Sequence, residues 1–298
     1  MYLQFSKRRR LVAAALFCAA LPAAAQDFPF RPITVINSFA AGGNADIVVR
    51  LAGQCLESAL GQPLVIENRP GANGVIAAEA VARARPGGYT LLLVSGAFPT
   101  MAATAKKPSF DPIKAYSWVS MMISYPLVVA VGAESPFKTL GELAAGAKAQ
   151  PGKLNYSAAG VGSQPLTELM GGSKVDLTFN TLSVVAPQLK AGKVRALAIT
   201  SPVRSAQLPG VPAVAETYPG YEAASFLGIA GPAGMPAPIV EKLNREIRKV
   251  LAQPEVQQRF TEFGGTAVST NPEDMGRLVE GEIGKWSRIV STRKIDVQ

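Results

Sequence analysis

The chain has 298 residues, a formal net charge of +9 and no histidine. Without histidine, Ser-His-Asp and Cys-His catalysis is excluded, and because Cys55 is the only cysteine of the expected mature chain, so are the usual zinc and other transition-metal sites. We expect neither a metal nor a cofactor. Lys and Arg are scattered along the chain and are not interleaved with aromatic residues. This distribution argues against nucleic-acid binding and is compatible with an acidic small ligand. The length favours about two domains.

The N-terminus has the pattern of a secretory signal. The basic residues Lys7–Arg10 precede an apolar run at 11–21, and Ala23–Ala25 supply the small residues of a cleavage site before Gln26. The run is too short to span a membrane. We therefore expect removal of residues 1–25, which carry four positive charges and no acid, and a periplasmic mature protein of net charge +5. Both general secretion and twin-arginine export fit the basic residues.

The first stretch of the mature chain predicts a strand, a glycine turn and a helix. Ile33–Ile36 form an apolar, β-branched run, and apolar residues then recur at helical spacing until Gly61. The turn between them presents free backbone N–H groups at the positive end of the helix dipole. An anion-binding site is predicted there, although any α/β protein needs a short turn at such a place. Its residues are Ala40, Ala41, Gly42, Gly43 and Asn44.

Strands alternate with helices along the rest of the chain. Strands are expected at 64–66, 91–94, 127–131, 154–157, 175–179, 194–200 and 226–230, and helices at 75–84, 139–150, 187–192, 236–251, 254–263 and from 272 onward. This order predicts an α/β fold with doubly wound, mainly parallel sheets. Ligands of such sheets bind at the carboxyl ends of the strands, so the first glycine turn and the loop at 95–100, with Ser95 and Gly96, should share one crevice.

A second glycine turn contains Ser157, Gly160, Gly162 and Ser163. It lacks the third glycine of a dinucleotide fingerprint and the acidic residue that should follow. A backbone cradle for an anion is the better interpretation. Asn180, at the end of the next strand, is a further candidate ligand contact.

Two side-chain patterns leave alternatives open. Asp46 could orient the first glycine turn, pair with Arg50 four residues further on, or meet an ammonium group if the ligand is an amino acid. Ser135 and Lys138 have the Ser-x-x-Lys spacing of acyl-transferring serine enzymes. Because no Lys-Thr-Gly or Ser-Asp-Asn partner is present, these two residues suit the start of a helix better than a hydrolase site.

Five motifs in order resemble those of the tripartite tricarboxylate transporter receptors, also called the Bug family of periplasmic solute-binding proteins. They are Gly42–Arg50, Glu67–Gly74, Pro86–Leu92, Pro151–Ser157 with Gly160–Ser163, and Ala191–Ala198. The resemblance implies a two-lobed, type II-like binding protein with a hinge and no enzymatic activity. Such a receptor captures a small carboxylate, here a di- or tricarboxylate or an acidic amino acid, and delivers it to membrane permease subunits. A monomer is expected.

By this resemblance, residues 26–125 and 226–298 form lobe one and residues 126–225 form lobe two. The hinge crossings should lie near Tyr125–Val129 and near Ala224–Leu227. A ligand carboxylate would be held between the two glycine turns, largely by backbone N–H groups and ordered water.

Lobe two is shorter than the family pattern. After Ser163 the family continues through a helix and a strand before a Leu-Leu-Gly-Gly segment, which 169–172 resembles. Here only the eleven residues Gln164–Lys174 separate Ser163 from the strand at Val175, whereas a crossover takes about a dozen. We therefore expect lobe two to lack a helix and a strand and to expose apolar surface. This leaves open the alternative of a receptor-derived protein that no longer binds a ligand.

Overall fold

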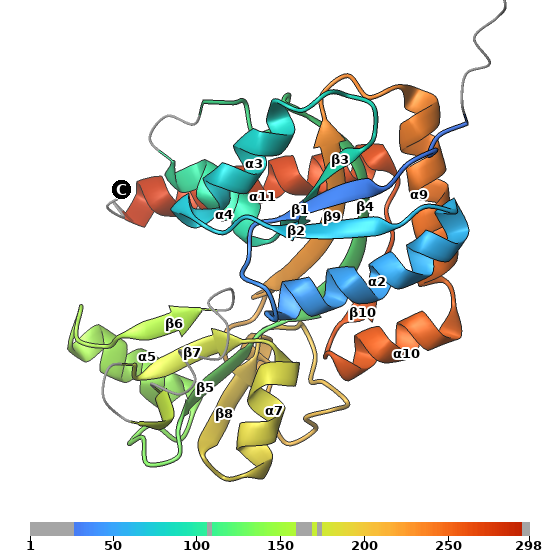
Figure 1. The fold of residues 1–298 in the computed structure, drawn as a ribbon. Helices are drawn as coiled ribbons and strands as arrows, with labels where there is room; N and C mark the ends of the chain where they lie inside the picture. Colours follow the sequence, from blue (N-terminus) through green and yellow to red (C-terminus); the bar gives the residue numbers. More distant parts are fainter. Residues whose placement is uncertain (1–26, 106–108, 159–168, 172–174, 294–298) are drawn as a thin grey trace, which may run out of the picture.

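A computed structural model describes residues 27–105, 109–158, 169–171 and 175–293. These residues form two lobes, each built around one sheet (Figure 1). The turn residues Gly160, Gly162 and Ser163 lie outside the described residues, as does the signal sequence. Of the segment Gln164–Lys174, where a helix and a strand are expected to be missing, only 169–171 are described.

The larger sheet has the strand order β10-β4-β9-β3-β1-β2. Its strands are β1 (Ile33–Asn37), β2 (Leu64–Asn68), β3 (Thr90–Ser95), β4 (Tyr116–Pro126), β9 (Ala224–Pro232) and β10 (Thr266–Ala267). β1 lies between β2 and β3 and runs parallel to both, whereas β9 is antiparallel to β3 and β4. The carboxyl ends of β1 and β3 therefore lie at the same edge, as the sequence predicts.

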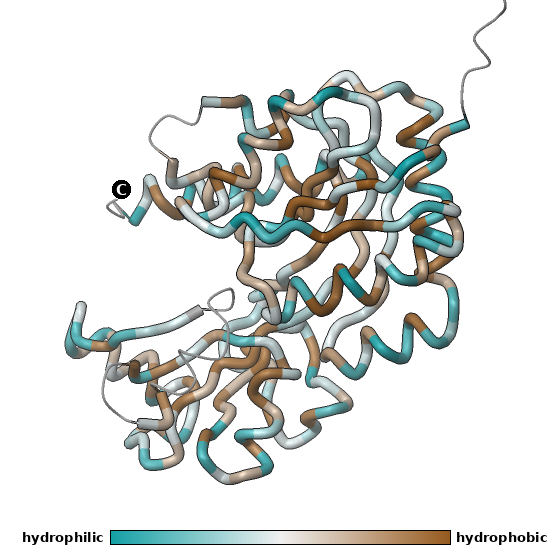
Figure 2. Tube along the Cα trace, in the orientation of Figure 1, coloured by the Kyte–Doolittle hydropathy of each residue, from teal (hydrophilic) through white to brown (hydrophobic). Residues whose placement is uncertain are grey.

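Helices cover both faces of this sheet (Figure 1). One face packs against α2 (Asn44–Leu60), α9 (Ala237–Leu251) and α10 (Pro254–Glu262), and the other against α3 (Val75–Ala82), α4 (Ala97–Thr104) and α11 (Pro272–Arg293). Along β1, Ile33 and Val35 enter the first core and Ile36 enters the second, because successive side chains of a strand point to opposite faces. Hydrophobic residues consequently concentrate in the central strands (Figure 2).

The smaller sheet has the order β6-β7-β5-β8. Its strands are β5 (Val128–Gly132), β6 (Tyr156–Ala158), β7 (Leu177–Asn180) and β8 (Val194–Ile199), and the helices around it are α5 (Leu140–Ala149), α7 (Leu182–Lys190) and α8 (Val214–Thr217). Leu143 and Val214 pack on one face, and Leu182 and Val185 pack on the other.

The predicted α/β class is confirmed, but the expectation of mainly parallel sheets is wrong. Only β1–β2, β1–β3 and β6–β7 are parallel among the described strand pairs, because β9 and β5 run against their neighbours and β10 runs against β4. The sequence also did not predict β4. Register shifts at Trp118–Ser120 and Met121–Ile123 interrupt its alternation, so the strand has no clean period of two.

The expected loop at 95–100 is shorter than predicted, because α4 begins at Ala97 directly after Gly96. Pro99 lies in the first turn of this helix, where the N–H group that proline lacks has no partner within the helix.

The chain passes between the lobes at two adjacent places. β4 ends at Pro126 and β5 begins at Val128. The N–H of Leu127 donates to Thr200 Oγ1 at 2.8 Å, and the N–H of Thr200 donates to the carbonyl of Leu127 at 2.9 Å. These bonds tie the first crossing to the start of the second, which leads to β9 from Ala224.

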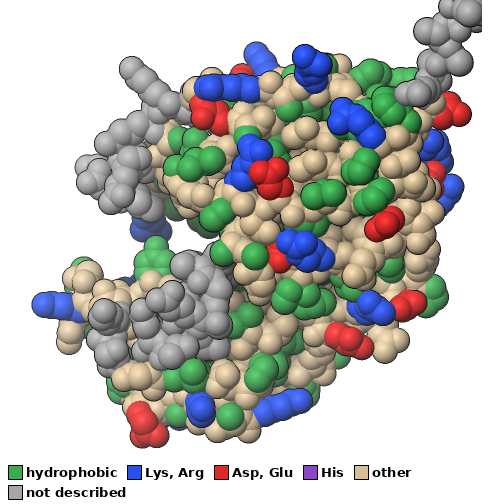
Figure 3. All heavy atoms as spheres, in the orientation of Figure 1, with side chains coloured by type: hydrophobic (Ala, Val, Ile, Leu, Met, Phe, Trp, Pro, Cys, Tyr) green, Lys and Arg blue, Asp and Glu red, His purple; other side chains and the backbone are tan. Residues whose placement is uncertain are grey.

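The lobes also touch beside α7. Ser183 Oγ lies 3.3 Å from Asn44 Oδ1, and Gln207 Nε2 donates to the carbonyl of Thr261 at 2.6 Å. On the side away from these contacts, the surface is hollowed between the lobes (Figure 3). The hollow lies beside the strand ends from which the sequence predicts ligand contacts.

Candidate functional site

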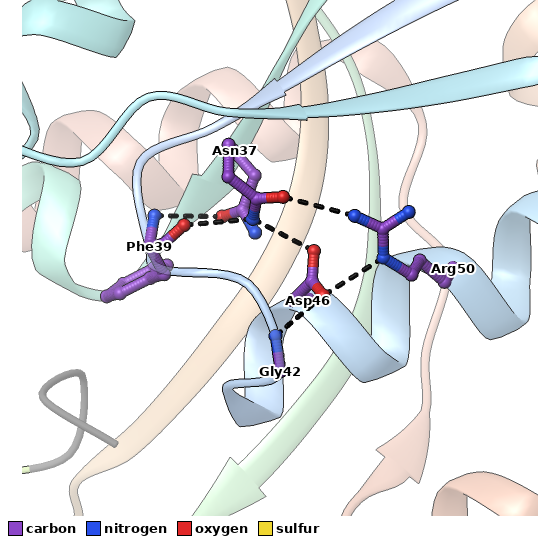
Figure 4. A network of polar contacts seen from close by, with 6 residues as sticks. Asn37, Phe39, Gly42, Asp46 and Arg50 are labelled. Atoms are coloured by element: carbon purple, nitrogen blue, oxygen red, sulfur yellow. Dashed lines mark hydrogen bonds and ion pairs between the residues drawn. The ribbon is translucent and has the colours of Figure 1, made fainter.

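The loop between β1 and α2 is held at three backbone atoms (Figure 4). Asn37 Oδ1 accepts the N–H of Phe39 at 3.1 Å, and Asn68 Nδ2 donates to the carbonyl of Phe39 at 2.9 Å. Asp46 Oδ2 accepts the N–H of Gly42 at 2.9 Å. Side chains from β1, β2 and α2 thus shape the loop before any ligand binds.

Asp46 is 3% exposed and has both carboxylate oxygens occupied. Oδ2 also accepts from Arg50 Nε, and Oδ1 accepts from Asn68 Nδ2, each at 2.9 Å. Burial alone would raise the pKa of Asp46, but the hydrogen bonds from Arg50, Gly42 and Asn68 outweigh it and lower the pKa to about 2. Of the three roles considered for Asp46, loop orientation and pairing with Arg50 both occur.

The N–H groups at this turn divide into two sets. Those of Gly42 and Gly43 bond to Asp46 and to the carbonyl of Ala40. Within the described part of the chain, the N–H groups of Ala40, Ala41 and Asn44 have no acceptor, and Gly43 caps α2 without a side-chain hydrogen bond. These free donors lie at the positive end of a 17-residue helix, an arrangement suited to a carboxylate.

Ser95 and Gly96 lie at the expected edge but use their polar groups internally. Ser95 Oγ accepts the N–H of Ala97 at 3.3 Å, and the N–H of Gly96 donates to the carbonyl of Phe226 at 3.0 Å. A Cβ atom on Gly96 would lie 2.6 Å from Ser225 Oγ, so close packing requires glycine here. The N–H of Gly96 is therefore engaged, whereas the hydroxyl of Ser95 accepts one bond and has no acceptor for its own proton among the described residues.

In lobe two the candidate contacts cluster at the end of β7. Ser157 Oγ donates to Thr178 Oγ1 at 2.9 Å, which joins β6 to β7. Asn180 is 4% exposed, and its Oδ1 accepts the N–H of Thr181 at 2.9 Å. Its Nδ2 has no hydrogen-bond partner in the described structure. Such a buried, unpaired donor is unusual in a folded protein.

The start of α7 is a part of the site that the sequence did not predict. Thr181 caps α7 without a side-chain hydrogen bond, and the helix begins at Leu182 rather than near Pro187. Ser183 reaches Asn44 at the start of α2, so two helix N-termini meet where the lobes touch. An Asn-Thr pair before an apolar run was the available cap signal, and the internal proline obscured it.

Ser135 and Lys138, which have the Ser-x-x-Lys spacing, form local hydrogen bonds just before α5. Lys138 Nζ donates to the carbonyl of Ser135 at 2.9 Å, and the hydroxyl of Ser135 accepts the N–H of Phe137. Thr139 and Glu142 form a capping box at the same helix start.

In the described part of the chain, no helix combines the length and apolar character needed to cross a membrane. The same residues contain no group of three His, Cys, Asp or Glu side chains placed to hold a metal ion.

The chain forms two α/β lobes joined by two adjacent crossings, and strands of both lobes end at the crevice between them. This is the architecture of the two-lobed periplasmic binding proteins. The chain belongs to the tripartite tricarboxylate transporter receptor family, whose model matches residues 48–167 and 162–295. A UPF0065 protein of Bordetella bronchiseptica is 34% identical over 97% of this chain and 93% of its own length. Protein BugT of Bordetella pertussis is 33% identical over 91% of this chain and 92% of its own length. The resemblance stated from the sequence motifs is confirmed.

Solved structures show the same fold. The periplasmic binding protein BugD has a TM-score of 0.81 at 29% identity, covering 91% of this chain and 100% of its own. Rpa4515 of R. palustris, solved with adipate, has a TM-score of 0.81 at 30% identity and covers 89% and 98% of the two chains. MatC of Rhodopseudomonas palustris, solved with bound malate, has a TM-score of 0.78 at 31% identity and covers 88% and 100%.

Proposed function

We propose that this protein is a periplasmic receptor that binds a small carboxylate between its lobes and delivers it to the membrane subunits of a tripartite tricarboxylate-type transporter. The observation that carries the proposal is the loop before α2. Its backbone is held by Asp46 and Asn68, while the N–H groups of Ala40, Ala41 and Asn44 have no acceptor among the described residues.

The related proteins support the ligand class, because Rpa4515 was solved with adipate and MatC with malate. In this chain the ligand would meet the first glycine loop from lobe one, with Ser95 and Gly96 as the adjoining wall. From lobe two it would meet Asn180, together with the turn from Ser157 to Ser163.

The test is a thermal-shift screen of the mature protein, beginning at Gln26, against mono-, di- and tricarboxylates and acidic amino acids, followed by calorimetry. A ligand present at one hundred times its dissociation constant should add about 2.7 kcal/mol to the free energy of unfolding. Failure of every carboxylate to stabilise or bind the folded protein would overturn the proposed function.

The alternative is a receptor-derived protein that no longer binds a ligand, and one observation favours it. Lobe two carries an apolar hollow of about 330 Å³ beside its edge strand β6, lined among others by Leu143, Tyr156 and Phe179. Tyr156 is 69% exposed. Apolar surface of this kind is what a missing helix would leave, and the same screen distinguishes the two functions.

Export is tested separately. We expect cell fractionation to place the protein in the periplasm and N-terminal sequencing to find a start near Gln26. An intact Met1 or a cytoplasmic location would contradict this part of the proposal.

A further inference from the structure

The strand β8 lies at one edge of the described lobe-two sheet, next to β5 (Figure 1). Two hydrogen bonds show which of its backbone groups point toward β5 and which point away. The N–H of Ala133, just after β5, donates to the carbonyl of Lys193 at 3.1 Å. On the opposite side, the N–H of Ile199 donates to the carbonyl of Pro212 at 2.9 Å. The end of β8 is therefore covered by the chain that follows it.

The start of β8 presents unpaired backbone at the same outer edge. Its pairing with β5 is in unbroken register from Val194 to Ala196. Backbone groups of an antiparallel strand point alternately toward and away from the partner strand. Because the carbonyl of Lys193 points toward β5, the N–H and C=O groups of Val194 and Ala196 point outward. Within the described ranges these groups have no hydrogen-bond partner.

A groove of about 450 Å³ lies along this part of the edge. Its lining includes Val194 and Ala196, Leu189 of α7 and the loop at 207–211. An open strand edge inside a groove can accept an extended peptide, which gains main-chain hydrogen bonds by adding a strand to the sheet. The groove lies at the end of β5 far from the crossing between the lobes, because Val194 pairs with Gly132.

The charge around the groove is positive. Among the residues that line it or adjoin its lining in sequence, Lys190, Lys193 and Arg195 are cationic and only Glu134 is acidic. Both lysines are exposed, and neither forms an ion pair in the part of the chain that the structure describes. A second copy would bring the same cations together, which opposes pairing of two β8 edges. An acidic side chain on a different partner would be attracted.

We propose that the start of β8 is a docking site for an extended segment of a partner protein that carries an acidic side chain. The segment adds as a strand to the lobe-two sheet and pairs with the backbone of Val194 and Ala196. Its acidic side chain lies near Lys190 and Lys193. The docking site lies outside the crevice, so the inference does not depend on which ligand the crevice binds.

The test titrates two peptides with blocked ends into ¹⁵N-labelled mature protein. One has the sequence Glu-Thr-Val-Thr-Val-Thr-Glu, and the other has lysine in place of both glutamates. The acidic peptide should move the backbone amide signals of Val194 and Ala196, and at low salt it should bind at least about tenfold more tightly than the basic peptide. Added salt should reduce this ratio, because it screens exposed charges.

Two pairs of variants locate the site. Ala196→Pro removes an outward N–H, which an edge strand tolerates, and should weaken binding of the acidic peptide at least about tenfold. Ala196→Ser keeps this N–H and should bind within about twofold of the wild type. Lys193→Gln should weaken binding about threefold, whereas the same change at the exposed Lys153, which does not line the groove, should leave it unchanged. Thermal unfolding verifies that each variant is folded, and the lysine pair carries the test if Ala196→Pro is not.

Several results would overturn the proposal. The site is wrong if the acidic peptide does not bind, or if it binds without moving the signals of Val194 and Ala196. Equal affinity for the two peptides would contradict an acidic partner. Slow hydrogen exchange at the N–H groups of Val194 and Ala196 in the free protein would show that another part of the chain already covers this edge. A dimer in sedimentation that Ala196→Pro abolishes would show that the occupant is a second copy.

Discussion

Asp46 is a buried carboxylate that holds the loop between β1 and α2 through the N–H of Gly42. It is four residues from both Gly42 and Arg50 in sequence, and Asn68 reaches it from β2. Because these donors stabilise the ionised form, the carboxylate strengthens the fold while it fixes the loop. Among the described residues, the N–H groups of Ala40, Ala41 and Asn44 remain without an acceptor.

Asp46→Asn tests this stabilisation through its pH dependence. The pKa of Asp46 is lowered from 3.8 to about 2, so its contribution is fully present above about pH 4 and is lost as the pH falls toward 2. Urea unfolding should find the variant about 2 kcal/mol less stable near pH 6, with the difference shrinking between pH 4 and 2.

Glu216→Gln is the comparison for this experiment. Its hydrogen bond with Arg204 and the N–H of Ala213 also lower the pKa of Glu216 to about 2, but this pair is exposed and should stabilise less. A constant difference between wild type and Asp46→Asn from pH 6 to 2 would contradict the assigned ionisation.

Two glycines in the left-handed conformation flank α2, Gly42 before its start and Gly61 at its end. Gly42 has a φ of +77°, a left-handed conformation that lets its N–H reach Asp46. Gly61 ends the same helix with a φ of +69°. The two glycines have the same kind of backbone conformation, but only Gly42 shapes the donor loop.

Gly42→Ala should therefore weaken carboxylate binding, whereas Gly61→Ala should not. A Cβ atom at either position has nothing within 4 Å, so each change costs only backbone strain, about 1 kcal/mol of unfolding free energy. Calorimetry and urea unfolding of both variants measure the two effects. Equal affinities in the two variants would place the carboxylate elsewhere.

The sheet of lobe two is less well covered by helices than the sheet of lobe one. β6 is a three-residue edge strand, and the apolar hollow beside it exposes part of the core formed by α5 and β7. Surface exposure and weak edge pairing lower the free energy of local opening.

Hydrogen exchange should accordingly be faster in β5–β8 than in β1 and β3, whose sheet is covered by helices on both faces. Exchange followed by mass spectrometry on the ligand-free mature protein measures this difference. Equal protection in the two sheets would show that lobe two is closed adequately and that our interpretation of the short segment is wrong.

The arrangement of the two lobes depends on close packing beside the crevice. Gly264, between α10 and β10, has a φ of +81°, and a Cβ atom on it would lie 2.5 Å from Leu182 Cβ. Leu182 is the first residue of α7. A glycine of lobe one thus sets how near the start of α7 comes to lobe one.

Gly264→Ala should separate the lobes at this point and weaken carboxylate binding. Gly234→Ala is matched to it, because Gly234 has a φ of +79° with nothing within 4 Å of its Cβ position. Both variants carry the same backbone strain, so the additional loss of stability and affinity in Gly264→Ala measures the contact with Leu182. Small-angle scattering measures the separation of the lobes, and calorimetry measures the affinity for the carboxylate. Identical behaviour of the two variants would contradict a role for the Gly264–Leu182 contact.

Short-range signals were sufficient for part of this molecule. Apolar periodicity and glycine placement predicted β1, its turn and α2, because a strand, a tight turn and a capped helix are specified by neighbouring residues. The ordered motifs predicted the family. The anion cradle at the turn stays a prediction: among the described residues the N–H groups of Ala40 and Ala41 are free, whereas those of Gly42 and Gly43 are bonded.

Only the tertiary structure decided which groups are free and which are engaged. Asn68 reaches Asp46 from 22 residues away, and Ser183 reaches Asn44 across 139 residues. β4 escaped prediction because its bulges are stabilised by pairing with β9 rather than by its own alternation. Hydrogen bonds and packing over such separations depend on where the folded backbone brings groups together, and no local pattern of residues encodes that position.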